Sequence, residues 1–209
     1  SIYNFFITNS WSSKLFKKIF NVAKERSIPK VSSITLKNHI KHYNNKRFDN
    51  SLSREVYLFI DEFSNYLDSS VGIDTLHLLN KLGYKVKTLN NKSSGRAFIS
   101  KGFLNQAKAV VNFNVTLFKN HIKISSPLIG IEPSAILSFK DEYLRLAKDK
   151  DGAKSIAKFT YTVEEFIAKE FKEGYIKSTS FTMKPKRIKI HGHCHHKAIG
   201  NINALKTIL

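Results

Sequence analysis

The run Val56-Tyr-Leu-Phe-Ile60 decides the fold of this chain. It is a series of apolar, strand-forming residues that stops at Asp61. Runs of this kind are typical of strands that are buried on both faces of a parallel sheet. Residues 71–82 follow with apolar side chains on one helical face, and Gly83 stands where helices commonly end in a left-handed residue. Strand, helix and glycine together predict the start of a βαβ unit.

The same alternation of strand and helix continues downstream. The expected strands are residues 85–89, 128–131 and 187–190, separated by expected helices at residues 103–122 and 132–146 and by one that begins at the capping-box sequence of residues 162–165. This order predicts an α/β fold with a mainly parallel, Rossmann-like sheet and helices on both faces. The glycine-rich dinucleotide fingerprint is absent, so the term Rossmann-like refers only to the order and connection of strands and helices.

Upstream of the sheet, residues 1–53 are expected to form a helical arm and a linker. Residues 11–23 predict an amphipathic helix that needs a partner surface, residues 36–43 predict a second short helix, and residues 44–53 have linker composition. Residues 54–150 are interpreted as a first α/β unit. Residues 151–209 are interpreted as the start of a second, incomplete unit.

The composition and net charge predict where the protein is found and what kind of partner it binds. The 209 residues include one cysteine and carry a formal net charge of +19, and no apolar stretch has the length of a membrane span. These features predict a soluble, cytoplasmic protein whose positive surface attracts acidic proteins or anionic membranes. Nucleic acid is disfavoured as a partner, because no basic patch interleaved with aromatic residues is present.

Four loops are expected at the carboxyl ends of the strands, where ligand sites form in open α/β sheets. Asp61 is a candidate general base or metal ligand, or else a helix N-cap. The Ser94-Gly95-Arg96 loop is a candidate anion site or a plain turn. Glu132 is a candidate catalytic group or a partner of Arg96. The spacing of these residues leaves each alternative open.

The fourth loop belongs to the segment Ile188-Lys-Ile-His-Gly-His-Cys-His-His-Lys-Ala198, which holds half of the eight histidines and the single cysteine. Thiolate and imidazole are the usual ligands of zinc, iron and iron–sulfur centres. Cys194, His193 and His195 are therefore the candidate metal ligands. Neighbouring side chains on an extended segment point to opposite faces, so a complete site needs ligands from elsewhere.

These loops also carry a family resemblance. Val56-Tyr-Leu-Phe-Ile-Asp-Glu-Phe, Ser94-Gly-Arg-Ala-Phe, Gly130-Ile-Glu-Pro-Ser and His191-Gly-His-Cys-His-His occur in that order. They resemble the cysteine-rich domain of bacterial oxidoreductases that contain FAD and iron–sulfur clusters and act on 2-hydroxy acids, of the glycolate oxidase and D-lactate dehydrogenase type. Heterodisulfide reductase contains a similar domain. The likeness covers about residues 54–200.

The resemblance implies electron transfer from a flavin, FAD, through a 4Fe-4S cluster to an electron acceptor. It implies that Cys194 is one cluster ligand with His193 and His195 near it. It further implies that a remnant cofactor-binding crevice is lined by Ser94, Gly95, Arg96, Glu132 and Ser134. The implied partners are the flavin-binding domain of a parent chain and the acceptor, and the implied location is the cytoplasm, peripheral to the inner membrane.

The chain departs from the family pattern at three positions. Asp61, Ser94 and Ala135 stand where relatives have cysteine, so the first unit resembles one that cannot hold a cluster through thiolates. The chain also stops before the downstream Cys-Cys-Gly segment of such domains. It is expected to be a fragment that is inactive alone and binds no cofactor when isolated. Its final helix, residues 198–209, is expected to leave Ile202, Leu205 and Leu209 exposed or paired with another copy.

A second hypothesis comes from a different functional class. The chain is then a non-catalytic docking or scaffold module that binds an acidic protein partner or an anionic membrane through its basic surface. A third reading is a zinc site at the His/Cys segment. The docking role predicts salt-sensitive association that survives Cys194→Ser, whereas the cluster role predicts that this change removes iron.

Overall fold

The structure, a computed structural model, describes residues 2–44, 54–182 and 184–209. Its centre is a sheet of four parallel strands, β1 (Arg54–Phe59), β2 (Tyr84–Lys87), β3 (Leu128–Gly130) and β4 (Thr160–Thr162), in the order β2-β1-β3-β4. The predicted parallel α/β fold is confirmed. Most of the expected linker, residues 45–53, lies outside the described residues.

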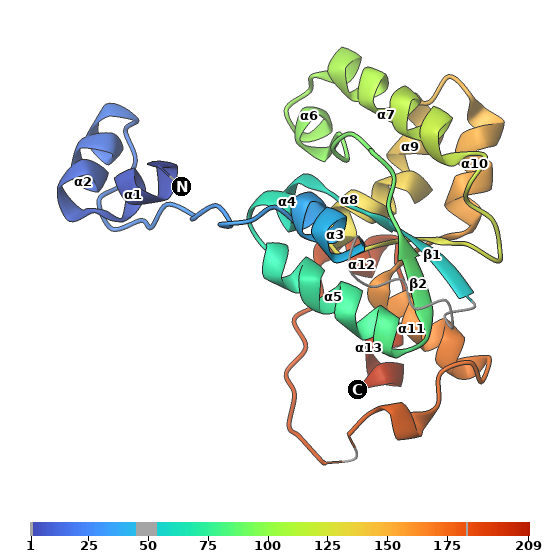
Figure 1. Cartoon of the computed structure of the whole chain (residues 1–209). Coiled ribbons are helices and arrows are strands. Elements are labelled where there is room, and N and C mark those ends of the chain that lie inside the picture. Colours follow the sequence, from blue (N-terminus) through green and yellow to red (C-terminus); the bar gives the residue numbers. More distant parts are fainter. Residues whose placement is uncertain (1, 45–53, 183) are drawn as a thin grey trace.

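Strand β1 is buried on both faces, as its continuous apolar run predicts. Val56 and Leu58 pack into one hydrophobic cluster, and Tyr57 and Phe59 pack into the other. Helices α3 (Leu36–Asn44), α5 (Ser69–Lys81) and α11 (Val163–Lys172) cover the first face, and α7 (Leu104–Phe118), α9 (Glu142–Leu146) and α10 (Lys150–Lys158) cover the second (Figure 1). The sheet is therefore the middle layer of three.

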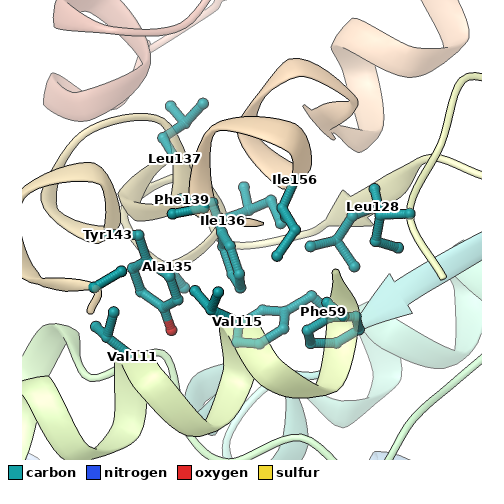
Figure 2. Packing of buried hydrophobic residues seen from close by; sticks show 14 of the residues in the cluster. Phe59, Val111, Val115, Leu128, Ala135, Ile136, Leu137, Phe139, Tyr143 and Ile156 are labelled. Atoms are coloured by element: carbon teal, nitrogen blue, oxygen red, sulfur yellow. The ribbon is translucent and has the colours of Figure 1, made fainter. Parts of the chain in front are cut away.

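The cluster on the second face is rich in aromatic and branched side chains (Figure 2). The ring of Phe59 meets the rings of Phe118 and Phe139, with centroids 6.1 and 5.1 Å apart, and Tyr143 stacks on Phe139. All four side chains are almost completely buried. This cluster holds α7 and α9 against the carboxyl half of the sheet.

The expected fourth strand at residues 187–190 is wrong. These residues belong to no strand, and Ile188 and Ile190 are exposed by 51% and 44%. The fourth strand is β4 instead, which follows α10 and pairs with β3. The alternation of isoleucine and lysine imitates a half-buried strand, but none of the described strands pairs with it. The capping box at Thr162 and Glu165, which starts α11, is confirmed.

The expected single helix over residues 132–146 is divided in three. It consists of α8 (Pro133–Ile136), the 3-10 turn η1 (Leu137–Lys140) and α9, and Asp141 between the last two has non-helical dihedral angles. Apolar residues occur on all sides of this segment, and five of them are fully buried: Ile136, Leu137, Phe139, Tyr143 and Ala135. A straight helix could not direct all of them into one core, whereas the bent path does.

The ends of the chain differ in detail from their expected form. The arm contains an additional helix, α1 (Ile2–Thr8), and α2 (Ser10–Ile19) ends four residues before the predicted helix. The C-terminal helix is divided into α12 (Cys194–Ala198) and α13 (Asn203–Ile208), and α13 packs on α11. Ile202 and Leu205 are therefore half-buried, whereas Leu209 is exposed. The remaining elements are α4 (Glu62–Tyr66), α6 (Arg96–Ser100) and η2 (Ser178–Ser180).

Candidate functional site

The strand order places a topological switch point between β1 and β3. The chain leaves β1 for β2 on one side and then crosses to β3 on the other. Crevices that bind ligands in open α/β sheets form at the carboxyl ends of such strands. Here that position is occupied by residues 61–62 after β1 and residues 131–132 after β3. We call this region, with residues 93–96, 142 and 193–196, the carboxyl edge.

Asp61 is a helix cap. Its Oδ1 accepts hydrogen bonds from the backbone N–H groups of Phe63 and Ser64 at 2.8 and 2.9 Å, and its Oδ2 accepts one from Ser64 Oγ at 2.7 Å. The side chain is almost completely buried, and this burial raises the pKa of Asp61 although the hydrogen bonds act in the opposite direction. Of the two alternatives for Asp61, the N-cap is the one found.

The Ser94-Gly95-Arg96 loop does bind an anion, and the anion belongs to the same chain. The backbone N–H and the hydroxyl of Ser94 donate to the two carboxylate oxygens of Glu62, each at 2.8 Å. Gly95 has a φ of +80°, a left-handed conformation that favours glycine. Turn chemistry and anion binding therefore coexist, and the Glu62 carboxylate occupies the two Ser94 donors, which were among the groups predicted to hold an anion.

Two buried residues of this edge were missed by sequence reasoning. The hydroxyl of Tyr143 donates to the carbonyl of Ser94 at 3.0 Å, and Asn114 Nδ2 donates to Tyr143 Oη at 2.9 Å and to the carbonyl of Ser93 at 3.0 Å. Asn114 Oδ1 accepts from the Lys92 N–H. An asparagine within the apolar stripe of α7 is the one sequence signal that points to this network. The network fixes the 93–96 loop to the core.

Tyr143 is expected to make the free energy of unfolding depend on pH in the alkaline range. Burial raises its pKa above that of an exposed tyrosine, so the folded state retains the proton after the unfolded state begins to lose it. The contribution of Tyr143 to stability is complete below about pH 10 and falls by about 1.4 kcal/mol per pH unit above it. Burial also raises the pKa of Tyr84, which adds a separate slope of the same sign. We expect Tyr143→Phe to remove this component, and to cost about 1–2 kcal/mol at pH 7 through lost hydrogen bonds.

The measurement is urea unfolding at pH 7 and at several pH values above 10. Tyr66→Phe is the matched control, because the Tyr66 side chain is exposed. If Tyr143→Phe keeps the same alkaline slope as the wild type, the buried hydroxyl is not its source.

Glu132 also caps a helix. Its Oε2 accepts from the N–H of Ala135 at 3.0 Å and from Ser134 Oγ at 2.7 Å. Among the described residues its pairing with Arg96, one of the two alternatives, does not occur. Arg96 pairs with Glu142 instead. The break before α9 brings Glu142 to this position, and nothing local in the sequence indicates it.

The His/Cys segment lies at the carboxyl edge although the strand expected to bring it there does not exist. His193 Nε2 is 3.6 Å from Glu132 Oε1, and His195 Nε2 is 3.8 Å from Glu142 Oε1. Helix α12 packs against α8, and Cys194 at its start is exposed. All four loops therefore meet. Glu62, after β1, binds Ser94 of the 93–96 loop. Glu132, after β3, and Glu142 lie beside histidines of the 193–196 loop. His196 points elsewhere, with its Nε2 3.9 Å from the buried carboxylate of Glu165.

The ligand groups of this edge do not converge on one point. Within residues 2–44, 54–182 and 184–209, no three His, Cys, Asp or Glu side chains are grouped so that they could hold a metal ion. The metal-ligand role of Cys194, His193 and His195 therefore stays a prediction. So does the cofactor-binding role of Ser94, Gly95, Arg96, Glu132 and Ser134, of which all but Gly95 have side chains bonded to partners in the protein.

The chain is similar to several proteins named D-2-hydroxyglutarate dehydrogenase. That of Haemophilus influenzae is 27% identical over 159 residues, which are 72% of this chain and 15% of that protein. That of Pantoea ananatis is 22% identical over 188 residues, 86% of this chain and 18% of that protein. That of Escherichia coli is 31% identical over 91 residues, 44% of this chain and 9% of that protein.

The chain thus spans less than a fifth of the length of these relatives. No protein-family model matches it, and no solved structure is significantly similar. The comparisons support the 2-hydroxyacid oxidoreductase part of the resemblance. They carry no information on its cysteine-rich, iron–sulfur part.

Proposed function

We propose that this chain is a non-catalytic docking domain of a 2-hydroxyacid dehydrogenase, whose carboxyl edge meets the part of the enzyme that binds FAD. The observation that carries the proposal is the position of residues 193–195 at the switch point, with His193 Nε2 3.6 Å from Glu132 Oε1, His195 Nε2 3.8 Å from Glu142 Oε1 and Cys194 exposed between them. This arrangement presents a defined surface at the place where α/β sheets bind their ligands.

The internal bonding of the first unit supports a scaffold role. Of the three positions where the resembled family has cysteine, Asp61 caps α4, Ser94 binds Glu62 and Ala135 lies in the core. All three side chains are almost completely buried. The polar atoms of Asp61 and Ser94 are bonded within the protein, so these side chains stabilise the edge and are not available to a substrate.

The iron–sulfur cluster implied by the resemblance does not fit the described residues. Such clusters are held by four thiolates, and this chain has one cysteine. A second candidate function is that Cys194 supplies a single ligand to a cluster whose other ligands lie elsewhere. The exposure of this thiol at the switch point favours that candidate.

An exchange of segments tests the proposal. The part of the Pantoea ananatis protein that aligns with this chain is replaced by this chain, and oxidation of D-2-hydroxyglutarate is followed through reduction of a dye. We expect the chimera to retain substrate-dependent reduction. The unaltered enzyme is assayed in parallel, and circular dichroism and gel filtration show whether the chimera folds. A folded chimera that does not oxidise D-2-hydroxyglutarate contradicts the proposal.

Variants of the chimera separate the two candidates. Glu142→Gln removes the carboxylate that pairs with Arg96 and lies 3.8 Å from His195, so a docking role predicts a lower rate and a stronger loss of activity with salt. Glu173→Gln, just after the end of α11, is the matched control, because that carboxylate forms an exposed pair with Lys169 away from the edge. Docking also predicts that Cys194→Ser changes neither activity nor iron content. Loss of iron and of visible absorbance in Cys194→Ser refutes a purely docking role and supports the ligand role.

A further inference from the structure

The arm exposes a concentration of large apolar side chains. Within residues 2–20, the following are exposed by 40–80%: Ile2, Tyr3, Phe5, Phe6, Trp11, Leu15, Ile19 and Phe20. Contiguous apolar surface of this kind is uncommon on soluble proteins and marks a site of interaction.

Helices α1 and α2 are separated by Asn9 alone and contact each other; we call residues 2–24, which contain both, the hairpin. The contact between the two helices leaves one apolar stripe uncovered. Ser12 faces α1, because its hydroxyl donates to the carbonyl of Phe6 at 2.8 Å. Trp11, Leu15 and Ile19 follow each other at intervals of four residues along α2 and are exposed by 75%, 47% and 67%. The stripe is therefore not used to hold the hairpin together.

The charge of the hairpin is entirely positive. Residues 2–24 contain four lysines, Lys14, Lys17, Lys18 and Lys24, and no aspartate or glutamate. These lysines, with serine and threonine residues, line a hollow of about 920 Å³ beside α2. Lys14 and Lys18 belong to the same helix as the apolar stripe. The hairpin thus offers a cationic hollow next to an apolar surface.

The hairpin is held away from the α/β layers. In Figure 1, α1 and α2 stand to one side of the molecule and the extended residues that follow lead to α3. The link is ordered by hydrogen bonds, since Asn4 Nδ2 donates to the carbonyl of Val31 at 2.7 Å and Ser32 Oγ donates to that of Leu67 at 3.0 Å. A broad, flat partner can therefore reach the hairpin without meeting the sheet domain.

We propose that this hairpin, residues 2–24, is an interfacial anchor that binds the anionic headgroups and outer acyl region of a phospholipid membrane. Helices that lie in a membrane interface combine a lysine-rich polar face with tryptophan, phenylalanine and leucine on the other face. Lysines beside the stripe extend their charged ends toward lipid phosphates while their alkyl parts cover apolar surface. Protein interfaces are instead depleted in lysine, so the composition favours lipid over an acidic protein. Among the described residues, no helix is both long and apolar enough to cross a bilayer.

Trp11 allows a direct test, because it is the only tryptophan in the chain. The full 209-residue chain is mixed with vesicles of phosphatidylcholine alone or of phosphatidylcholine with phosphatidylglycerol, and its tryptophan emission is recorded. We expect the emission to shift to shorter wavelength and saturate only with the phosphatidylglycerol vesicles. We also expect the shift to weaken as salt increases.

Two variants keep the reporter and separate the contributions. Lys14→Gln combined with Lys18→Gln should weaken vesicle binding about fivefold for each lysine removed. Leu15→Asp should abolish the shift in emission, and circular dichroism confirms that it folds. The matched control is Lys101→Gln combined with Lys108→Gln, which removes the same charge from exposed positions near α6 and on α7. It should bind vesicles like the wild type.

Three results would overturn the proposal. The first is an absence of shift with phosphatidylglycerol vesicles. The second is an equal shift with phosphatidylcholine alone, which would mean that the lysines do not select the lipid. The third is a blue-shifted emission without vesicles that depends on protein concentration, which would show that a second copy of the chain covers the stripe. The proposal does not depend on the dehydrogenase function, so the two can fail separately.

Discussion

Replacing Phe59 with alanine is expected to lower the free energy of unfolding by about 3–5 kcal/mol. Phe59 is fully buried at the end of the central strand β1, where its ring touches Phe118 of α7 and Phe139 of η1. Truncation removes these contacts and leaves a cavity that the neighbouring backbone elements cannot fill. Because domains of this kind are stable by about 5–15 kcal/mol in total, the variant should be close to unfolding.

Urea unfolding followed by circular dichroism measures the effect, with the slope of the transition as a check that the unfolded state is unchanged. Phe103→Ala is the matched control, because the Phe103 ring is 54% exposed, and it should change stability by no more than about 0.5 kcal/mol. Equal losses in the two variants would mean that the sheet does not depend on the aromatic cluster of its second face.

The elements with long, regular patterns could be predicted from the sequence. Strand β1, helix α5 and the start of α11 follow from an apolar run, a helical stripe with Gly83 behind it and a capping box. In each case the local preference and the burial that the fold requires agree. The arm helices are less regular, and the break at Asn21, which has a φ of 51°, has no clear signal in the apolar pattern.

Strand β4 could not be predicted, because its three residues form a strand only through their pairing with β3. Thr160 and Thr162 are buried beside Leu128 and Gly130, which are about 30 residues away in the chain and set the register. The more strand-like residues 187–190 pair with no strand in the described part of the chain. Tertiary contacts therefore override local propensity at both positions.

The carboxyl edge was predicted in its location but not in its contacts. Loops that follow parallel strands must gather at one edge, and those after β1, β2 and β3 do. Residues 193–196 reach the same edge without a strand before them. The pairing of Arg96 with Glu142, rather than with Glu132, follows from the bend between η1 and α9. That bend arises from the burial of the surrounding core, which cannot be deduced from the spacing of charged residues. The network of Asn114 and Tyr143 has the same origin.

Gly130→Ala is expected to disturb the core and the carboxyl edge together. A Cβ at this position would lie 2.5 Å from Ile136 Cβ and 2.7 Å from Ile136 Cγ1, much closer than carbon atoms approach without a clash. Gly130 pairs with Phe59 on one side and Thr162 on the other, so the strand cannot move away. Helix α8 must move instead. We expect a loss of about 1–3 kcal/mol from overpacking.

The movement of α8 distinguishes this variant from a simple loss of stability. Glu132 caps α8 and lies beside His193, so a displaced α8 should loosen residues 132–136 and 193–198. Hydrogen exchange should rise in both segments while it stays unchanged in α5, on the other face of the sheet. Gly83→Ala is the control. Gly83 has a φ of +91°, and a Cβ there would have no neighbour within 4 Å, so alanine adds only about 1–2 kcal/mol of backbone strain. Hydrogen exchange in residues 132–136 and 193–198 could instead be the same in Gly130→Ala and Gly83→Ala. This result would mean that β3 and α8 are not in close contact and that the position of the His/Cys segment has another cause.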